Sequence, residues 1–436
     1  MPLKLDAHDP GFKEAFAAFL NAPRDDNANV EGVVRDIITD VRKRGNKAVI
    51  ELSRRFDRVD LTAETLRISE SEIADARGAC TNAELDALAL AAERITAFHQ
   101  RQLPENLSYR DESGVDLGYR WTPIGAAGIY VPGGKASYPS SVLMNAIPAR
   151  VAGVDRVAMA VPTPDGVLNP LVLAAADLAG VTEIYRIGGA QAVAALAYGT
   201  ETIAPVDKIT GPGNAFVAEA KRQVFGVVGI DMIAGPSEIL VVADNRNDPQ
   251  WIAADLLSQA EHDQLAQSIL ITDDASFAEA VEAAVEQQLE TLPKADIARA
   301  SWDNHGAIIL VADLADAVAL VDAIAPEHLE LAVADADALA DQVRNAGAIF
   351  LGRHTPEAMG DYVAGPNHVL PTSRSARFSS GLSVLDFMKR TSLVRLDPTS
   401  IAKIGPAAVT LAEAEGLDAH ARSVAMRLDG GIKGNS

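Results

Sequence analysis

Hydrophobic and polar positions along the chain follow two periods, one typical of helices and one typical of strands. The first hundred residues are mainly helical in pattern, with predicted helices at 11–20 and 30–56 and in a long segment after residue 68. Strand-like sequence punctuated by Gly and Pro begins near Tyr119. The pattern therefore predicts a helical N-terminal part that precedes a sheet.

From Tyr119 onward, short apolar runs alternate with helical patterns. The first block predicts strands at 156–162, 183–189 and 237–244, and helices at 169–179, 190–199 and 214–225. A second block predicts helices at 248–263, 277–292, 316–325 and 337–346, and strands at 267–273, 306–311, 329–333 and 347–352. Such alternation is typical of right-handed crossovers in parallel sheets. The predicted fold class is α/β with two parallel-sheet, incomplete Rossmann-like units, an N-terminal helical arm and, after about Ser379, a loop-rich tail ending in a helix.

Charge and cysteine content narrow the class of protein. The 436 residues include 38 Lys and Arg against 60 Asp and Glu, a net charge of −22. Such an acidic chain repels nucleic-acid phosphates and anionic lipid, so we expect no nucleic-acid partner and no membrane partner. The single cysteine, Cys80, cannot form an internal disulfide, which favours a cytoplasmic protein.

Two Gly-rich turns precede predicted helices in the first block. They are Gly188-Gly189 and Gly211-Pro212-Gly213. Backbone amides at such turns can hold a phosphate or another anion. Neither turn has the G-x-G-x-x-G pattern, and each alone is more often an ordinary connection. Two of them in one parallel unit favour a nucleotide-type ligand.

Metal-ligating residue types occur at four places. Gln259 and His262 are three residues apart on a helical pattern, so both can face one point. Asp361 follows the predicted strand 347–352, and we expect it at the carboxyl edge, where parallel sheets place ligands. His420 lies in the tail helix. Two nitrogens and two oxygens suit zinc or manganese, although each residue alone is more often a surface, core or turn residue.

Glu327 and His328 follow Pro326 and precede a predicted strand, which places them in a turn. A carboxylate beside an imidazole can act as a general acid–base pair. A solvated turn is the alternative. His368 could line a site, but nothing in the sequence requires it.

Eight blocks of this sequence resemble the signature blocks of the histidinol dehydrogenase family, in the family's order. They are 128–154, 188–200, 206–221, 234–244, 255–263, 325–331, 360–372 and 414–420. The resemblance implies a zinc-dependent, NAD-linked four-electron oxidation of L-histidinol to L-histidine through histidinal, the last step of histidine biosynthesis. It covers the chain from about residue 30 to the C-terminus.

The resemblance also implies roles for particular residues. His328 would be the general base, and Glu327 would activate the water that attacks histidinal. The implied zinc ligands are Gln259, His262, Asp361 and His420, and the implied NAD contacts are Tyr130, Gln191 and Asn214. The implied substrate contacts are Ser237, Gln259, His262, His328, Asp361, Glu415 and His420.

The family resemblance further implies a domain-intertwined homodimer in which each C-terminal tail reaches the partner's active site. The expected domains are an N-terminal arm (1–26), an α/β domain with the metal and catalytic residues (27–120 and 238–379), an NAD-binding α/β domain (121–237) and the tail (380–436).

Two alternatives remain open at this level. One is a related zinc- and NAD-linked dehydrogenase of another polar alcohol, for example a sulfonated one, although Glu415 and His420 favour an amino alcohol. The other is a zinc hydrolase with Glu327 as its base. The hydrolase leaves the two Gly-rich helix starts unexplained.

Overall fold

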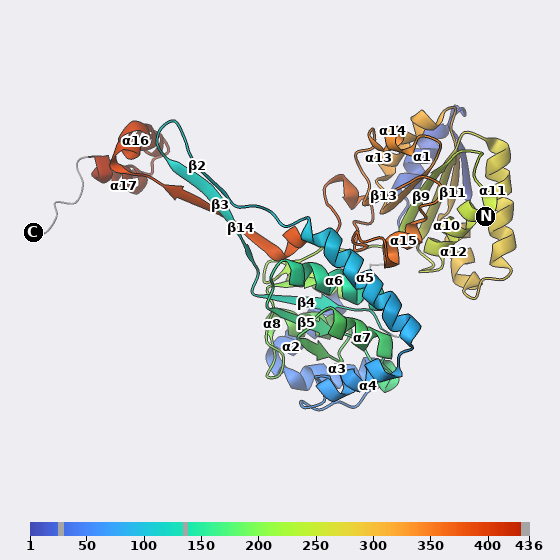
Figure 1. Ribbon diagram of the computed structural model, residues 1–436, viewed down its shortest axis with the longest axis horizontal. Coiled ribbons are helices and arrows are strands. Elements are labelled where there is room, and N and C mark those ends of the chain that lie inside the picture. Colours follow the sequence, from blue (N-terminus) through green and yellow to red (C-terminus); the bar gives the residue numbers. More distant parts are fainter. Residues whose placement is uncertain (25–29, 134–137, 429–436) are drawn as a thin grey trace, which may run out of the picture.

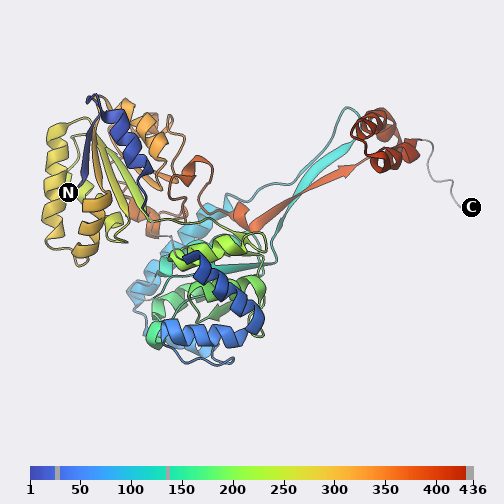
Figure 2. The ribbon, with the colours of Figure 1, turned by 180° about the vertical axis from the view of Figure 1, so that it is seen from behind.

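The computed structural model describes residues 1–24, 30–133 and 138–428. Two α/β units, each built on a parallel sheet, lie side by side, and an arm that carries the C-terminal helices projects away from them (Figure 1). The same arrangement is seen from behind in Figure 2. The predicted α/β class with two parallel-sheet units is therefore confirmed.

The first unit contains a five-stranded parallel sheet in the order β6-β5-β4-β7-β8. Its strands are β4 (Ala126–Tyr130), β5 (Arg156–Ala160), β6 (Glu183–Tyr185), β7 (Lys208–Thr210) and β8 (Gly229–Ile230). The helices that follow these strands are α6 (Pro139–Val151), α7 (Pro170–Leu178), α8 (Gly189–Tyr198) and α9 (Ala215–Val224).

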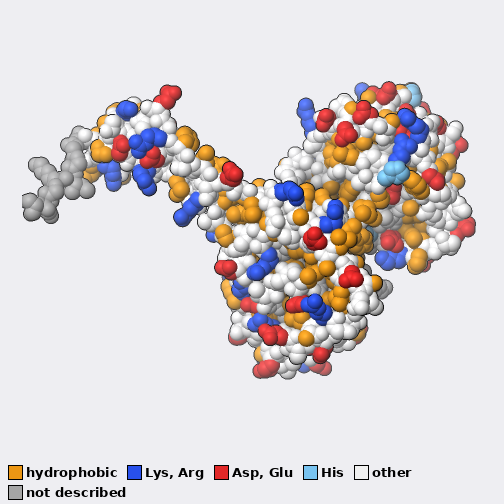
Figure 3. All heavy atoms as spheres, viewed as in Figure 1, with side chains coloured by type: hydrophobic (Ala, Val, Ile, Leu, Met, Phe, Trp, Pro, Cys, Tyr) orange, Lys and Arg blue, Asp and Glu red, His pale blue; other side chains and the backbone are white. Residues whose placement is uncertain are grey.

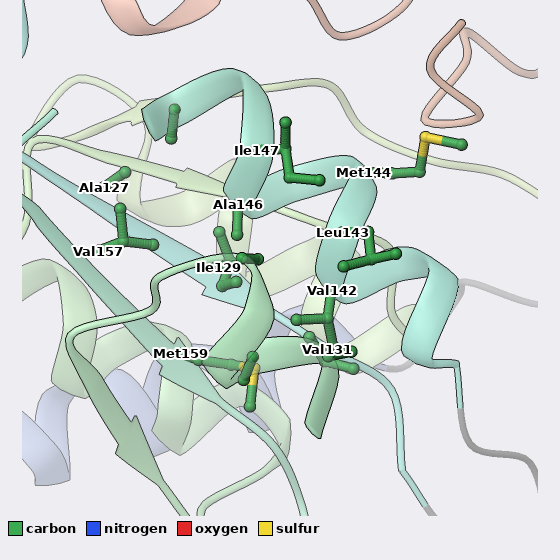
Figure 4. Packing of buried hydrophobic residues seen from close by; sticks show 14 of the residues in the cluster. Ala127, Ile129, Val131, Val142, Leu143, Met144, Ala146, Ile147, Val157 and Met159 are labelled. Atoms are coloured by element: carbon green, nitrogen blue, oxygen red, sulfur yellow. The ribbon is translucent and has the colours of Figure 1, made fainter. Parts of the chain in front are cut away.

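Strand β4 is buried along its whole length because helices cover both faces of the sheet. Its residues Ile129 and Ala127 belong to a core that includes Val142 and Leu143 of α6 (Figure 4). Tyr130, the next residue along, belongs to the core on the other face. This packing holds the end of β4 firmly in place.

The second unit contains a six-stranded parallel sheet in the order β1-β11-β10-β9-β12-β13. Its strands are β1 (Leu3–Asp6), β9 (Glu238–Ala243), β10 (Gln267–Thr272), β11 (Ala307–Leu310), β12 (His328–Ala332) and β13 (Ala348–Leu351). Its helices are α1 (Phe12–Asn21), α10 (Pro249–Ala260), α11 (Ala275–Leu289), α12 (Ala295–His305), α13 (Ala317–Ile324), α14 (Ala336–Ala340) and α15 (Glu357–Tyr362). The helix predicted over 337–346 is thus only the short α14.

The expected domain boundaries are wrong at the N-terminal side. Of the expected arm (1–26), the described residues 1–24 are not separate, because β1 pairs with β11 and Phe16 of α1 packs in the core of the six-stranded unit. Segment 27–120 does not join this unit either. Its helices α2 (Val30–Arg44), α3 (Asn46–Asp57), α4 (Glu70–Ala79) and α5 (Asn82–Gln100) pack on the five-stranded unit. Helical periodicity shows which face of a helix is buried, but not which sheet buries it.

The tail is not simply loop and helix. Strand β14 (Met388–Arg395) pairs antiparallel with β3 (Asp116–Pro123), which also pairs with β2 (Leu107–Arg110). This ribbon carries α16 (Pro398–Ala414) and α17 (Asp418–Leu428), which pack against each other. Figure 3 shows hydrophobic side chains along the arm, and the exposed ones include Val394, Leu411 and Met426.

Among the described helices, none combines the length and the apolar character that a membrane crossing requires.

Candidate active site

A buried acid–imidazole pair lies at the amino ends of two neighbouring strands, β9 and β12. His328 is the first residue of β12 and pairs with Ile239 of β9, and Glu327 precedes it. Their exposed fractions are 4% for His328 and 7% for Glu327. The alternative of a solvated turn is therefore wrong.

The main chain of Glu238 orients both members of this pair. His328 Nδ1 lies 2.9 Å from the carbonyl oxygen of Glu238, and the Glu238 N–H donates to Glu327 Oε2 at 2.9 Å. Because a carbonyl oxygen only accepts, Nδ1 must carry the proton of this hydrogen bond. The neutral ring then keeps its lone pair on Nε2, which has no hydrogen-bond partner in the described part of the chain. Nε2 is thus available to accept a proton.

The surroundings of Glu327 and His328 shift the pKa of both side chains. Burial raises the pKa of Glu327 to about 8, although the charge of His328 lowers it. Burial lowers the pKa of His328, but the carboxylates of Glu327, Glu357 and Asp361 outweigh it, so the pKa of His328 is raised. The imidazole is therefore surrounded by groups that stabilise its protonated form.

Helix α15 adds two carboxylates. Glu357 and Asp361 are four residues apart and share one face of the helix. His328 Nε2 lies 3.9 Å from Glu357 Oε1 and 4.0 Å from Asp361 Oδ1. Ser258 Oγ holds the other oxygen of Glu357 at 2.9 Å. The ligand atoms of His328, Glu357 and Asp361 lie within 4.8 Å of one another, close enough to hold a metal ion.

Two of the other predicted ligands lie at this same end of the sheet. Gln259 is buried near the end of α10, and its Oε1 has no hydrogen-bond partner among the described residues. His262 follows two residues after α10 ends. Burial raises the pKa of Asp361, but the imidazoles of His368, His328 and His262 outweigh it and lower that pKa to about 2. Three of the four predicted donors are thus brought together.

The residues on the tail are not close to them in the same chain. His420 lies on α17 and Glu415 directly follows α16, so both are at the tip of the arm, far from α10 and α15 (Figure 1). Both side chains are exposed. Ser237 lies directly before β9, and its carbonyl oxygen accepts from the Gln267 N–H at 2.9 Å.

The expected position of Asp361 at the carboxyl edge is wrong. Strand β13 ends at the carboxyl edge of the sheet, but the chain then turns back before α15. Asp361 on α15 therefore lies near His328, at the amino end of β12. His368, left open by the sequence, has Nδ1 at 3.5 Å from Asp361 Oδ1 and Nε2 at 3.4 Å from Ser141 Oγ of α6. It thereby connects the acidic group to the five-stranded unit.

Sequence reasoning missed Glu357 and Glu238. For Glu357 a signal was present, because it stands four residues before Asp361 on a helical pattern. Glu238 starts an apolar strand and acts through its main chain, which no side-chain pattern reveals.

A second candidate region lies at the carboxyl edge of the five-stranded sheet. From β4 the chain continues to β5 and β6 on one side, and it then returns through α8 to β7 on the other side of β4. The junction of β4 and β7 is therefore a topological switch point. Tyr130 ends β4, and its hydroxyl accepts from the Gly189 N–H at 3.0 Å. At Gly211, which has a φ of +109°, a Cβ atom would lie 2.1 Å from the Tyr130 carbonyl oxygen. Glycine is therefore required where the two strands separate.

The other two predicted NAD contacts begin helices at this edge. Gln191 is buried in the first turn of α8. Asn214 caps α9, because its Oδ1 accepts from the N–H groups of Phe216 at 3.1 Å and Val217 at 3.2 Å. The starts of α8 and α9 carry the partial positive charge of helix N-termini, which favours phosphate groups.

Comparison with known proteins identifies close relatives. A family model described as histidinol dehydrogenase matches residues 20–428. The histidinol dehydrogenase of Rhodospirillum rubrum is 67% identical over 99% of this chain and 100% of its own length. That of Rhizobium meliloti is 64% identical, with both chains fully covered. The crystal structure of histidinol dehydrogenase from Elizabethkingia anophelis matches with a TM-score of 0.93 at 36% identity, covering 98% of each chain.

Proposed function

The chain belongs to the histidinol dehydrogenase family and is an oxidoreductase, and from this premise we propose that it oxidises L-histidinol to L-histidine through histidinal, with zinc and NAD. The observation that carries the proposal is the buried Glu327–His328 pair. Its members are oriented by one main-chain residue and lie beside a cluster of carboxylates. Such a pair suits proton removal from an alcohol and from water.

The donor set fits zinc. Gln259 has a buried carbonyl oxygen without a hydrogen-bond partner among the described residues, and Asp361 has a carboxylate that stays ionised. With His262 they give one nitrogen and two oxygens, which are ligand types that zinc accepts. We propose these three as ligands, with His420 supplied by a second copy of the chain. Zinc, when bound, would act as a Lewis acid and orient the imidazole and amine of the substrate.

The arm explains why a second copy is needed. In one chain, His420 and Glu415 lie at the tip of the arm, remote from the other proposed ligands. The arm exposes apolar side chains such as Leu411 and Met426, which a partner subunit could cover. We propose a homodimer in which the arm of each chain completes the other site, with Glu415 opposite the ammonium group of the substrate.

In the first oxidation, His328 is the base. Its Nδ1–H is held by the Glu238 carbonyl, so Nε2 accepts the hydroxyl proton of histidinol. NAD, when bound, would accept the hydride of the carbinol carbon. The product of this step is histidinal. The surrounding carboxylates stabilise the imidazolium that forms.

In the second oxidation, Glu327 takes a proton from the water that attacks histidinal. The charge of His328 lowers the pKa of this buried carboxyl group, which favours its role as a base once His328 is protonated. As water adds, His328 returns its proton to the aldehyde oxygen, so Nε2 is free again to take a proton from the hydrated aldehyde. A second NAD, when bound, would accept the second hydride. Overall, histidinol, two NAD and one water give histidine, two NADH and three protons.

The five-stranded unit is proposed to bind NAD. Tyr130, Gln191 and Asn214 lie at or directly after the carboxyl edge of that sheet, on both sides of the switch point. Helix starts at such an edge bind the pyrophosphate of dinucleotides. Substrate would contact Ser237 together with the proposed zinc ligands.

The test combines activity with metal analysis. Purified protein supplied with zinc and NAD should form two NADH per histidinol, followed by the absorbance of reduced nicotinamide. His328→Gln should lower kcat by about 10²- to 10⁴-fold while zinc content stays at the wild-type level. NADH formation only with another alcohol would favour the related dehydrogenase, and ester or amide hydrolysis without NADH would favour the hydrolase.

A further inference from the structure

Three passages of the chain between the two α/β units meet at the start of β9. The first leaves the six-stranded unit after α1 and enters the five-stranded unit at α2. The second connects β8 with β9. The third follows α15 and returns to the five-stranded core at Val369 and Leu382. The start of β9 is therefore where the relative position of the two units is set.

The Glu238 side chain joins these passages. Its Oε1 forms an ion pair with Arg24, which follows α1 in the first passage. The same oxygen accepts from the Ser373 N–H of the third passage at 3.1 Å. Three residues earlier, in the second passage, the Gly235 N–H donates to Thr372 Oγ1 at 2.6 Å. The carboxylate is buried, with an exposed fraction of 3%, so it depends on these partners for compensation of its charge.

The Glu238 main chain is also the element that orients the proposed catalytic pair. Its carbonyl oxygen accepts the hydrogen bond of His328 Nδ1–H, and its N–H donates to Glu327 Oε2. A displacement of this one residue would therefore rotate the base and move the carboxylate together. Positional errors of this kind, even about 1 Å, can cost about 10²-fold in rate.

We propose that Arg24 and Glu238 are positioning residues for the reaction. Their buried ion pair anchors the passage between the two units at the start of β9, and so holds the Glu238 main chain where it orients His328 and Glu327. The inference rests on the proposed function, because it presupposes that His328 is the base. Neither residue touches the reacting atoms.

The test compares Arg24→Met with a matched loss of an ion pair elsewhere. Arg156 Nη2 binds Glu183 Oε2 at 2.9 Å at the amino end of β5, away from both candidate regions. We expect Arg24→Met to lower kcat per folded, zinc-loaded enzyme by about tenfold or more, with a smaller change in the KM for histidinol. Arg24→Lys should restore a large part of kcat. Arg156→Met should lower Tm and leave kcat unchanged.

A spectroscopic measurement separates positioning from stability alone. In the full-length protein labelled with ¹⁵N-histidine, the Nδ1–H resonance of His328 is identified by its absence in His328→Gln. It should shift or broaden in Arg24→Met and stay unchanged in Arg156→Met. If Arg24→Met does not fold, Glu238→Gln removes the charge but keeps the main-chain groups, and the same loss of kcat and change in resonance are expected.

The outcomes are distinct. A wild-type kcat and an unchanged His328 resonance in Arg24→Met, or in Glu238→Gln in its place, would overturn the positioning role. An active His328→Gln would instead overturn the assignment of the base in the proposed function, whatever Arg24→Met does.

Discussion

The buried carboxyl group of Glu327 gives the stability of the zinc-free protein a pH dependence that can be calculated. Burial raises the pKa of this group to about 8 from an ordinary value of 4.5. The folded chain therefore holds the proton more tightly than the unfolded chain does. Since the folded state binds more protons in this range, the free energy of unfolding falls as pH rises from about 4.5 to about 8. Glu327→Gln removes this effect.

The magnitude follows from the size of the shift. Each pH unit within the window costs about 1.4 kcal/mol of stability. Between about pH 6 and about pH 9, the wild-type chain should therefore lose about 3 kcal/mol that Glu327→Gln does not lose. The measurement is urea unfolding with a metal chelator at one fixed protein concentration, followed by circular dichroism at several pH values. Subtracting the two curves removes the contribution of the groups that Glu327 does not affect, which leaves Glu327 itself and its partner His328.

A control and a refuting result complete this test. Glu279→Gln changes an exposed glutamate on α11, and its stability relative to wild type should not vary with pH across this range. If the advantage of Glu327→Gln over wild type stays constant from about pH 6 to about pH 9, the carboxyl group does not hold a proton in the folded protein. The reasoning from burial would then be refuted.

Three further predictions concern the proposed metal and NAD regions. His262→Ala should abolish stoichiometric zinc binding, measured by metal analysis after dialysis, and full zinc retention would exclude it as a ligand. Gly211→Ala should destabilise the fold by about 2 kcal/mol or more, because it adds a clash with Tyr130 to the strain of a positive φ. Gly226→Ala, with a φ of +99° but no atom within 4 Å of its Cβ, is the control and should cost less in thermal unfolding. Tyr130→Phe removes the acceptor of the Gly189 N–H and should cost about 1–2 kcal/mol in stability or in NAD binding, both measured by calorimetry. No change in either quantity would show that this hydrogen bond is dispensable.

The candidate residues were predictable because their chemistry is local. The adjacent Glu327 and His328 and the three-residue spacing of Gln259 and His262 are visible in the sequence. The structure places all four at one end of one sheet. Glu357 could have been found from its spacing to Asp361. Glu238 could not, because its role comes from main-chain atoms that every residue possesses.

Several structural relations could not be predicted because they depend on segments far apart in the chain. Strand β14 pairs with β3, and β1 pairs with β11, across long separations that leave no local signal. The same reason explains why segment 27–120 was assigned to the wrong unit. An amphipathic helix has an apolar face that suits either sheet, and which sheet buries it depends on contacts with distant segments.

The amino-acid sequence by itself determined the alternation of helices and strands, the α/β class, and which positions carry side chains of the types that can serve as acids, bases or metal ligands. These properties depend on side chains and their near neighbours. Only the tertiary structure decided that Asp361 returns to the amino end of the sheet beside His328, and that Glu238 joins three passages of the chain beneath that pair. These properties depend on how distant segments compete to bury apolar surface and to pair buried charge.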